Sequence, residues 1–370
     1  MASVIEEVAG GWIKELLDLP REASFAFTTG CQLAHFTCLA SARASVLEKA
    51  GWNVNEGGLC GAPKIRVLTS EHRHGSVDRA VRFLGLGNKS IESIAADRNG
   101  RMEPGALQVA LHKTQQPTIL VLSAGDLNIA AFDPFDEIIP LAKQAGTWVH
   151  VDGAFGLFSR ASAKFRHLTA GIEQADSWAT DAHKWLNVPF DCGMAIVRDR
   201  AAHREAMTIS ASYIAADSNA RDQIDWNPEW SRRARGIPVY AALRELGREG
   251  VADLIERTSR HCLRLVTEIG RLPGAQMLWE PRLNQGLVRF LDQRPGASDG
   301  DHDSRTERIV AAVNADGEAF FSTTTWRGER AMRVSVVNWR TSERDVERAI
   351  RAVKRALGGP DSGSEIAEAD

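Results

Sequence analysis

The sequence lacks the features that mark several classes of protein. No apolar run is long enough to span a bilayer, and the first residues have neither the basic start nor the apolar core of a signal peptide. The formal net charge is −3, so there is no excess of positive charge to attract nucleic acid or an anionic membrane. We therefore expect a cytoplasmic protein whose partners include neither nucleic acid nor a membrane.

Cysteine is scarce and dispersed. The five cysteines form no Cys-X-X-Cys pair, and they stand at positions 31, 38, 60, 192 and 262. Disulfide frameworks and zinc sites both need paired or clustered cysteines, whereas an odd and scattered set is typical of a reducing compartment. We predict that the protein holds no metal.

An ordinary globular composition carries a repeating pattern of strands and helices. Hydrophobic residues make up 44% and charged residues 25% of the 370 residues, which is enough for a large core and two domains. Short apolar runs are typical of strands buried on both faces, and they occupy residues 65–68, 118–122, 148–151 and 194–197. A helical pattern that opens at Asp133-Pro134 and closes at Gly146 lies between two of them. This alternation predicts an α/β fold with a mostly parallel sheet.

The pattern changes at about residue 272. Residues 287–290 and 332–336 alternate like half-buried strands, and residues 306–313 and 343–357 have helical patterns. We therefore predict a smaller α+β domain at the C-terminus. The predicted divisions are an N-terminal helix over 1–20, a large α/β domain over 21–271, the small domain over 272–357 and a frayed tail over 358–370.

Two segments of the large domain place reactive side chains in unusual positions. Asp152 ends an apolar strand, and ligands of open α/β sheets bind at the carboxyl ends of strands, although an aspartate there also caps turns. Lys184 stands between His183 and Trp185 in a largely apolar stretch. Such a lysine either reaches out to solvent from a helix start or, when desolvated, loses its proton and attacks aldehydes.

A third segment has the composition of a phosphate site. Thr28-Thr29-Gly30-Cys31-Gln32 precedes a helical pattern that continues through Ala44. The free N–H groups and the macrodipole of a helix start favour an anion, and Gly30 allows close backbone approach. An ordinary turn before a helix, without any ligand, would account for the same residues.

Taken together, these segments resemble the group II decarboxylases of amino acids, which depend on pyridoxal phosphate (PLP). The resemblance covers residues 5 to 357 and implies the aspartate-aminotransferase fold, also called fold type I. The matching segments, in order, are Gly11–Pro20, Phe27–His35, His74–Ala80, Phe132–Pro134, Asp152, Asp181–Trp185 and Asp191–Gly193.

The resemblance implies a role for each candidate residue. Lys184 would carry PLP as a Schiff base, Asp152 would pair with the pyridine nitrogen, and His74 would stack on the ring. A surface helix cap is the alternative for His74. The cofactor would also contact Gly30, Cys31, Gln32, Asn128, Ala154, Asp181 and His183. The family further implies a homodimer and an arginine, Arg333, that faces the substrate, although Arg333 also suits a surface strand.

Four departures from the family qualify the reaction that we expect. Family members have several dozen residues before the Gly11–Trp12 helix, Asp181 and His35 each stand where asparagine is common, and the loop near Ala215–Trp226 has no tyrosine. We expect decarboxylation of an L-amino acid, aromatic ones included, to an amine and CO2. The alternatives are oxidative decarboxylation to an aldehyde, carbon–carbon cleavage or transamination on the same scaffold, and a catalytically silent, truncated partner.

Overall fold

The computed structural model describes residues 1–208 and 221–358, which divide into two compact units. The first unit comprises residues 1–126 and 131–253, and the second comprises residues 127–130 and the chain from residue 254. The predicted boundary at residues 271 and 272 lies at the end of a helix that begins in the first unit, so the domain limits remain a prediction. Most of the predicted tail lies outside the described residues.

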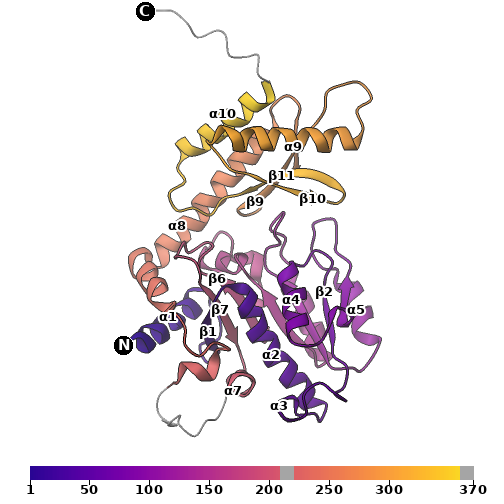
Figure 1. Ribbon diagram of the computed structural model, residues 1–370, viewed down its shortest axis with the longest axis vertical. Helices are drawn as coiled ribbons and strands as arrows, with labels where there is room; N and C mark the ends of the chain where they lie inside the picture. The colour runs from indigo at the N-terminus through magenta and orange to yellow at the C-terminus, as the bar shows by residue number, and fades with distance from the viewer. Residues whose placement is uncertain (209–220, 359–370) are drawn as a thin grey trace, which may run out of the picture. The chain divides into compact units, whose positions relative to one another are not determined.

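A seven-stranded sheet forms the centre of the first unit (Figure 1). Its strand order is β1-β7-β6-β5-β4-β2-β3, and only β7 runs antiparallel to its neighbours. The strands are β1 (Ser24–Thr28), β2 (Arg66–Ser70), β3 (Ile91–Ile94), β4 (Thr118–Ser123), β5 (Trp148–Asp152), β6 (Ser177–Asp181) and β7 (Gly193–Val197). This sheet confirms the predicted α/β class.

Helices cover the sheet because its strands are apolar on both faces. Helix α2 packs across five of the strands and against three other helices, and its alanine-rich face lets it approach the sheet closely (Figure 1). Its partners in the core include Val121, Ala179 and Ala195. The helices of this unit are α1 (Ala2–Leu16), α2 (Cys31–Lys49), α3 (Val54–Gly57), α4 (Gly75–Phe83), α5 (Pro104–His112), α6 (Phe135–Gln144) and α7 (Arg200–Met207), with short 3-10 turns at Asn88–Ser90, Gly156–Ala161, Arg166–Thr169, Ile172–Gln174 and Gln223–Trp226.

The second unit is built on a four-stranded antiparallel sheet in the order β10-β11-β9-β8. Helix α8 (Gly236–Gly270) leads into it and is broken at Gly247, whose φ of 60° lies outside the helical region. The remaining elements are β8 (Ala275–Trp279), β9 (Gln285–Phe290), α9 (Asp299–Asp316), β10 (Ser322–Trp326), β11 (Glu329–Ser335) and α10 (Glu343–Gly358). Among the described residues, no helix is both long and apolar enough to cross a membrane.

Candidate cofactor site

The start of helix α2 forms one wall of the site. Gly30 has a φ of 80°, and the helix that begins at Cys31 has no side-chain N-cap. A Cβ on Gly30 would lie 3.2 Å from His183 Cε1, and one on Gly193 would lie 2.3 Å from the Gly30 carbonyl carbon. The backbone can approach this closely only with glycine at both positions. The N–H groups of Cys31 and Gln32 thus stand at a helix start without a side-chain cap, the position that favours an anion.

The carboxyl ends of β5 and β6 form the floor. Asp152 pairs in register with Ala179, and Asp181 ends β6 two residues further on. The turn after β6 brings Lys184 Nζ to 3.1 Å from Asp181 Oδ2. The N–H of Ala154 donates to Asp152 Oδ1 at 3.1 Å, which fixes the carboxylate at the end of its strand. Parallel strands thus place both carboxylates at the same edge of the sheet.

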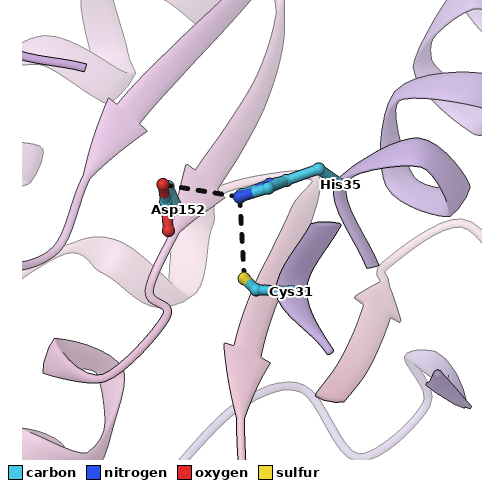
Figure 2. Close-up of side chains that lie close together, drawn as sticks. All are labelled: Cys31, His35 and Asp152. Carbon is cyan, nitrogen blue, oxygen red and sulfur yellow. Dashed lines mark hydrogen bonds and ion pairs between the residues drawn. The ribbon is translucent and has the colours of Figure 1, made fainter. Parts of the chain in front are cut away.

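Asp152 is kept negatively charged by its neighbours. Burial by itself would raise the pKa of Asp152, but the contact with His35 and the charge of Lys184 outweigh burial and hold the pKa well below its usual range. His35 Nε2 lies 3.4 Å from Asp152 Oδ2 and also 3.6 Å from the Cys31 sulfur (Figure 2). An ionised carboxylate at this depth can pair with a cationic ring.

Lys184 is held as an ammonium ion when no ligand is bound. Burial is the largest single effect and lowers the pKa of Lys184, but the neighbouring groups, Asp181 foremost and then others that include Asp152, together outweigh it, so the net shift is upward. The other oxygen of that carboxylate, Oδ1, is buried and has no hydrogen-bond partner among the described residues. It lies 3.5 Å from where a Cβ on Gly30 would stand, so it faces the start of α2.

Comparisons with known proteins show the family of the chain. The family model described as the pyridoxal-dependent decarboxylase conserved domain matches residues 2–290. The chain belongs to this family. An L-2,4-diaminobutyrate decarboxylase of Rhizobium meliloti (strain 1021) is 29% identical over 364 residues, which are 95% of this chain and 70% of the relative. A 4-hydroxyphenylacetaldehyde synthase of Rhodiola rosea is 26% identical, over 95% of this chain and 73% of that relative.

A solved structure of Oryza sativa TDC with PLP and tryptamine has the same fold. Its TM-score is 0.89 at 21% identity, and the match covers 96% of this chain and 76% of the other. The expected family and fold type I are therefore confirmed. As a member of the pyridoxal-dependent decarboxylase family, the protein is a PLP-dependent carboxy-lyase that acts on an amino acid.

The site residues fit the cofactor of the pyridoxal-dependent decarboxylases. Gly30 and the uncapped start of α2 leave room and N–H donors for a phosphate. The Nδ1 atom of His183 accepts the N–H of Cys192 at 3.1 Å, so its proton stands on Nε2 and can be donated. The unpartnered Oδ1 of Asp181 is the exception, since a second anion beside a phosphate would be unfavourable.

Two further residues predicted as cofactor contacts tie the edges of the site together. Gln32 Nε2 donates to the carbonyl of Ser76 at 3.3 Å, which links the start of α2 to the start of α4. His74 is the N-cap of α4, because its Nδ1 accepts the Ser76 N–H at 3.2 Å. Desolvation lowers the pKa of His74, and the charges of Asp152 and Lys184 also act on it. His74 is therefore a helix cap that also lies within electrostatic reach of the site.

Asn128 and Arg333 belong to the second unit. Asn128 Oδ1 accepts a hydrogen bond from Thr324 Oγ1 at 2.8 Å. Arg333 donates to Ser322 Oγ at 3.1 Å and to the carbonyl of Leu127 at 3.3 Å. These bonds hold both residues within their own unit, and their cofactor and substrate roles stay predictions.

His35, His150 and Ser177 form part of the site's interior and were not predicted to have a role. The sequence signal that could have found His150 is the alternation of side chains along β5, which places His150 on the same face as Asp152.

A group of possible metal ligands lies beside these residues. The donor atoms of Cys31, His35 and Asp152 lie within 4.8 Å of one another, as metal ligands do. Burial, and then the charges of Asp181 and Asp152, raise the pKa of Cys31 well above its usual value. That no metal is bound stays a prediction.

Proposed function

We propose that this protein removes the α-carboxylate of an L-amino acid as CO2, with Lys184 as the residue that holds PLP covalently. The observation that carries the proposal is the pairing of Lys184 with Asp181 beside the ionised Asp152 at one sheet edge. Bound PLP supplies the electron sink that takes up the electron pair left on Cα when CO2 departs.

The chain's own groups would bind and orient the cofactor. The N–H groups of Gly30, Cys31 and Gln32 and the Nε2–H of His183 would bind the phosphate. Asp152 would face the ring nitrogen with its negative charge, and Ala154 N–H holds that carboxylate in place. His74 would lie against one face of the ring, where its neutral imidazole also helps to exclude water.

Lys184 would then act on the substrate. The Lys184 amine lies within hydrogen-bond reach of Asp181, and this carboxylate would stabilise the protonated amine while a substrate is bound. That ammonium ion would return a proton to Cα after CO2 has left. Decarboxylation needs this proton to arrive at carbon, and Asp181 therefore favours the amine as product.

We further infer an L-amino acid as substrate, aromatic ones included, a homodimer and a cytoplasmic location. The relatives act on substrates of several kinds, so the substrate's side chain is open, and Arg333 and Asn128 are the residues of the second unit that we assign to cofactor and substrate contacts. The exposed aromatic ring of Phe190 lies against the His183 ring, with 4.3 Å between centroids and the two planes tilted by 31°. A second copy of the chain that covers it would keep water from Lys184.

Oxidative decarboxylation to an aldehyde is the second candidate. The described part of the loop near residues 215–226 begins at Arg221, and the whole loop has no tyrosine to protonate Cα. A relative named as an aldehyde synthase points the same way. Amine with CO2 identifies the decarboxylase, whereas aldehyde with ammonia, CO2 and hydrogen peroxide, formed at the expense of dioxygen and water, identifies the oxidative reaction. Transamination and carbon–carbon cleavage would retain the carboxylate in a keto acid or in a shortened amino acid.

The first experiment is a visible absorption spectrum of the protein mixed with PLP, before and after borohydride. We expect a cofactor band that borohydride bleaches while it fixes the pyridoxyl group on the peptide containing Lys184, as read by mass spectrometry. Lys184→Ala should lack the band, and Lys164→Ala, which changes an exposed lysine, should keep it. A folded wild type without the band would exclude the catalytic reading and favour a silent partner.

A further inference from the structure

A row of buried polar side chains lies behind Asp152. His35 Nε2 lies 3.4 Å from Asp152 Oδ2, and His35 Nδ1 lies 2.9 Å from His150 Nε2. His150 Nδ1 lies 2.9 Å from Ser177 Oγ, and Trp148 Nε1 donates to the same hydroxyl at 3.0 Å. His35, His150 and Ser177 have no exposed surface. Polar groups at this depth are unfavourable unless each has a partner, and here each one does.

The two ends of the row fix the direction of its hydrogen bonds. The indole of Trp148 can only donate, and the carboxylate of Asp152 can only accept. Burial, followed by the nearby His35, lowers the pKa of His150 to about 3, so His150 is neutral and has one N–H. With a neutral His35 as well, the bonds form one series: the Ser177 hydroxyl donates to His150 Nδ1, His150 Nε2–H donates to His35 Nδ1, and His35 Nε2–H donates to Asp152.

The Cys31 thiol does not compete with Asp152 for the hydrogen on His35 Nε2. Its sulfur lies 3.6 Å from His35 Nε2, on the same nitrogen that faces Asp152 (Figure 2). Because burial and the neighbouring carboxylates keep the thiol protonated, it brings no negative charge to that nitrogen. The His35 Nε2–H is therefore directed to the carboxylate of Asp152.

We propose that His35 is a positioning residue that orients Asp152 and preserves its charge toward the cofactor's ring nitrogen. The row through His150 and Ser177 holds the His35 imidazole in the tautomer that donates from Nε2. A fixed negative charge at Asp152 favours a proton on the ring nitrogen that it faces. The proposal rests on the proposed function, because that function assigns the ring nitrogen to Asp152.

The first test needs no cofactor. Imidazole NMR of protein labelled with 15N-histidine should show the proton of His35 on Nε2, and His35→Gln identifies its signals. His35 protonated on Nδ1 alone would overturn the proposal, because Nε2 would have no hydrogen to donate to Asp152. This result is independent of any catalytic activity.

The second test reads the cofactor with the pyridine nitrogen of PLP labelled with 15N. Wild type should give the signal of a protonated ring nitrogen, and His35→Leu should move it toward the unprotonated value. His35→Gln should restore the signal, since its amide N–H reaches the position of Nε2. Groups that orient a ligating side chain typically change activity about 10- to 100-fold when removed, and we expect His35→Leu to reduce kcat by that factor.

Matched variants separate this role from a loss of packing. His203 is as buried as His35 and contacts Ser24 Oγ at 2.8 Å and the carbonyl of Trp226 at 2.9 Å, so His203→Gln should leave the ring-nitrogen signal unchanged. Ser177→Ala removes the far hydroxyl while leaving His35 in place, and it should shift the signal in the same direction if His35→Leu does not fold. An unchanged signal in His35→Leu and in Ser177→Ala, with the cofactor still on Lys184, overturns the positioning role and leaves the proposed function intact. Failure of wild type to bind PLP at Lys184 overturns the proposed function instead.

Discussion

Asp181 decides how readily Lys184 and a phosphate can share the same site. Its Oδ2 lies 3.1 Å from Lys184 Nζ, while its buried Oδ1 has no hydrogen-bond partner within residues 1–208 and 221–358. A buried acceptor without a donor costs about 1–3 kcal/mol. Asparagine, which the family commonly has here, would offer an N–H in place of that oxygen. Asp181 therefore stabilises the cofactor-free lysine and opposes an incoming anion.

We predict that Asp181→Asn binds PLP more tightly. Removing the charge and adding a donor should lower the dissociation constant about tenfold, because a hydrogen bond to a charged group contributes about 1.5–3 kcal/mol. The change should also speed the capture of PLP at neutral pH, since Lys184 loses the carboxylate that raises its pKa. Absorbance titration of cofactor-free protein measures both effects. Asp176→Asn, at the other end of β6 and paired with Lys143, is the control, and equal or weaker binding by Asp181→Asn would contradict the prediction.

The thiols should differ sharply in reactivity. Cys60 is exposed, whereas the other four cysteines are buried. Burial raises the pKa of Cys38 and that of Cys192 to about 12, so neither forms the reactive thiolate at neutral pH. We expect a thiol reagent to modify one cysteine quickly in the native protein and the other four only after denaturation. Cys60→Ser should abolish the fast phase, and a fast phase that survives this change would show that a buried thiol is accessible.

At the scale of elements, Asp133 connects the end of β4 to the segment before α5. Its carboxylate accepts the N–H of Met102 and the N–H of Ser123, each at 2.7 Å. Burial nevertheless raises the pKa of Asp133 from 3.8 to about 6, because the two hydrogen bonds only partly offset the loss of hydration. The folded state therefore binds a proton more tightly than the unfolded state does.

This shift predicts a specific dependence of stability on pH. Between pH 4 and pH 6 the unfolded chain loses the Asp133 proton first, so this residue's contribution to the free energy of unfolding falls as pH rises, by up to about 3 kcal/mol. Asp133→Asn cannot titrate, and its destabilisation relative to wild type should shrink by that amount over the same range. Urea unfolding at each pH measures the difference. A constant difference from pH 4 to pH 6 would exclude a raised pKa, and Asp136→Asn, on the neighbouring helix, is the control.

The elements also show which parts of the fold the sequence could predict. The strands β2, β4, β5 and β7 were predicted because their apolar runs are continuous, and α6, α9 and α10 because their patterns repeat. Strands β1 and β6 were not, since each begins with a buried serine. Ser24 contacts His203 and Ser177 contacts His150, and such partners, which are far away in the sequence, are invisible in a local pattern.

The candidate site also has residues that the sequence could indicate and residues that it could not. Lys184 and Asp152 could be singled out because each stands in an unusual local position, at a strand end or in a His-Lys-Trp triplet, whereas their roles come from the family resemblance and stay predictions. The role that we propose for His35 could not be predicted, because it depends on contacts with Asp152 and His150, which lie in β5 and far away in the sequence. Contacts that join separate segments therefore limit what a single sequence shows about a site.

At the scale of the whole molecule, the exposed ring near Lys184 argues for a second copy. Phe190 is 75% exposed although it contacts the ring of His183, the neighbour of Lys184. An apolar ring of this size gains about 1.5–3 kcal/mol when it is removed from water. In a two-fold dimer the same surface is buried on both copies, so its contribution counts twice.

We therefore predict a dimer of twice the 40.5 kDa chain mass that depends on Phe190. Phe190→Ser should raise the dissociation constant of the dimer at least about tenfold, as expected when 1.4 kcal/mol or more is lost. Light scattering over a dilution series measures this constant, with Phe83→Ser, which changes another exposed ring, as the control. Retention of PLP should fall in parallel, because water then reaches Lys184. A wild-type monomer that still forms the cofactor band would refute the homodimer and leave the chemistry at Lys184 to a single chain.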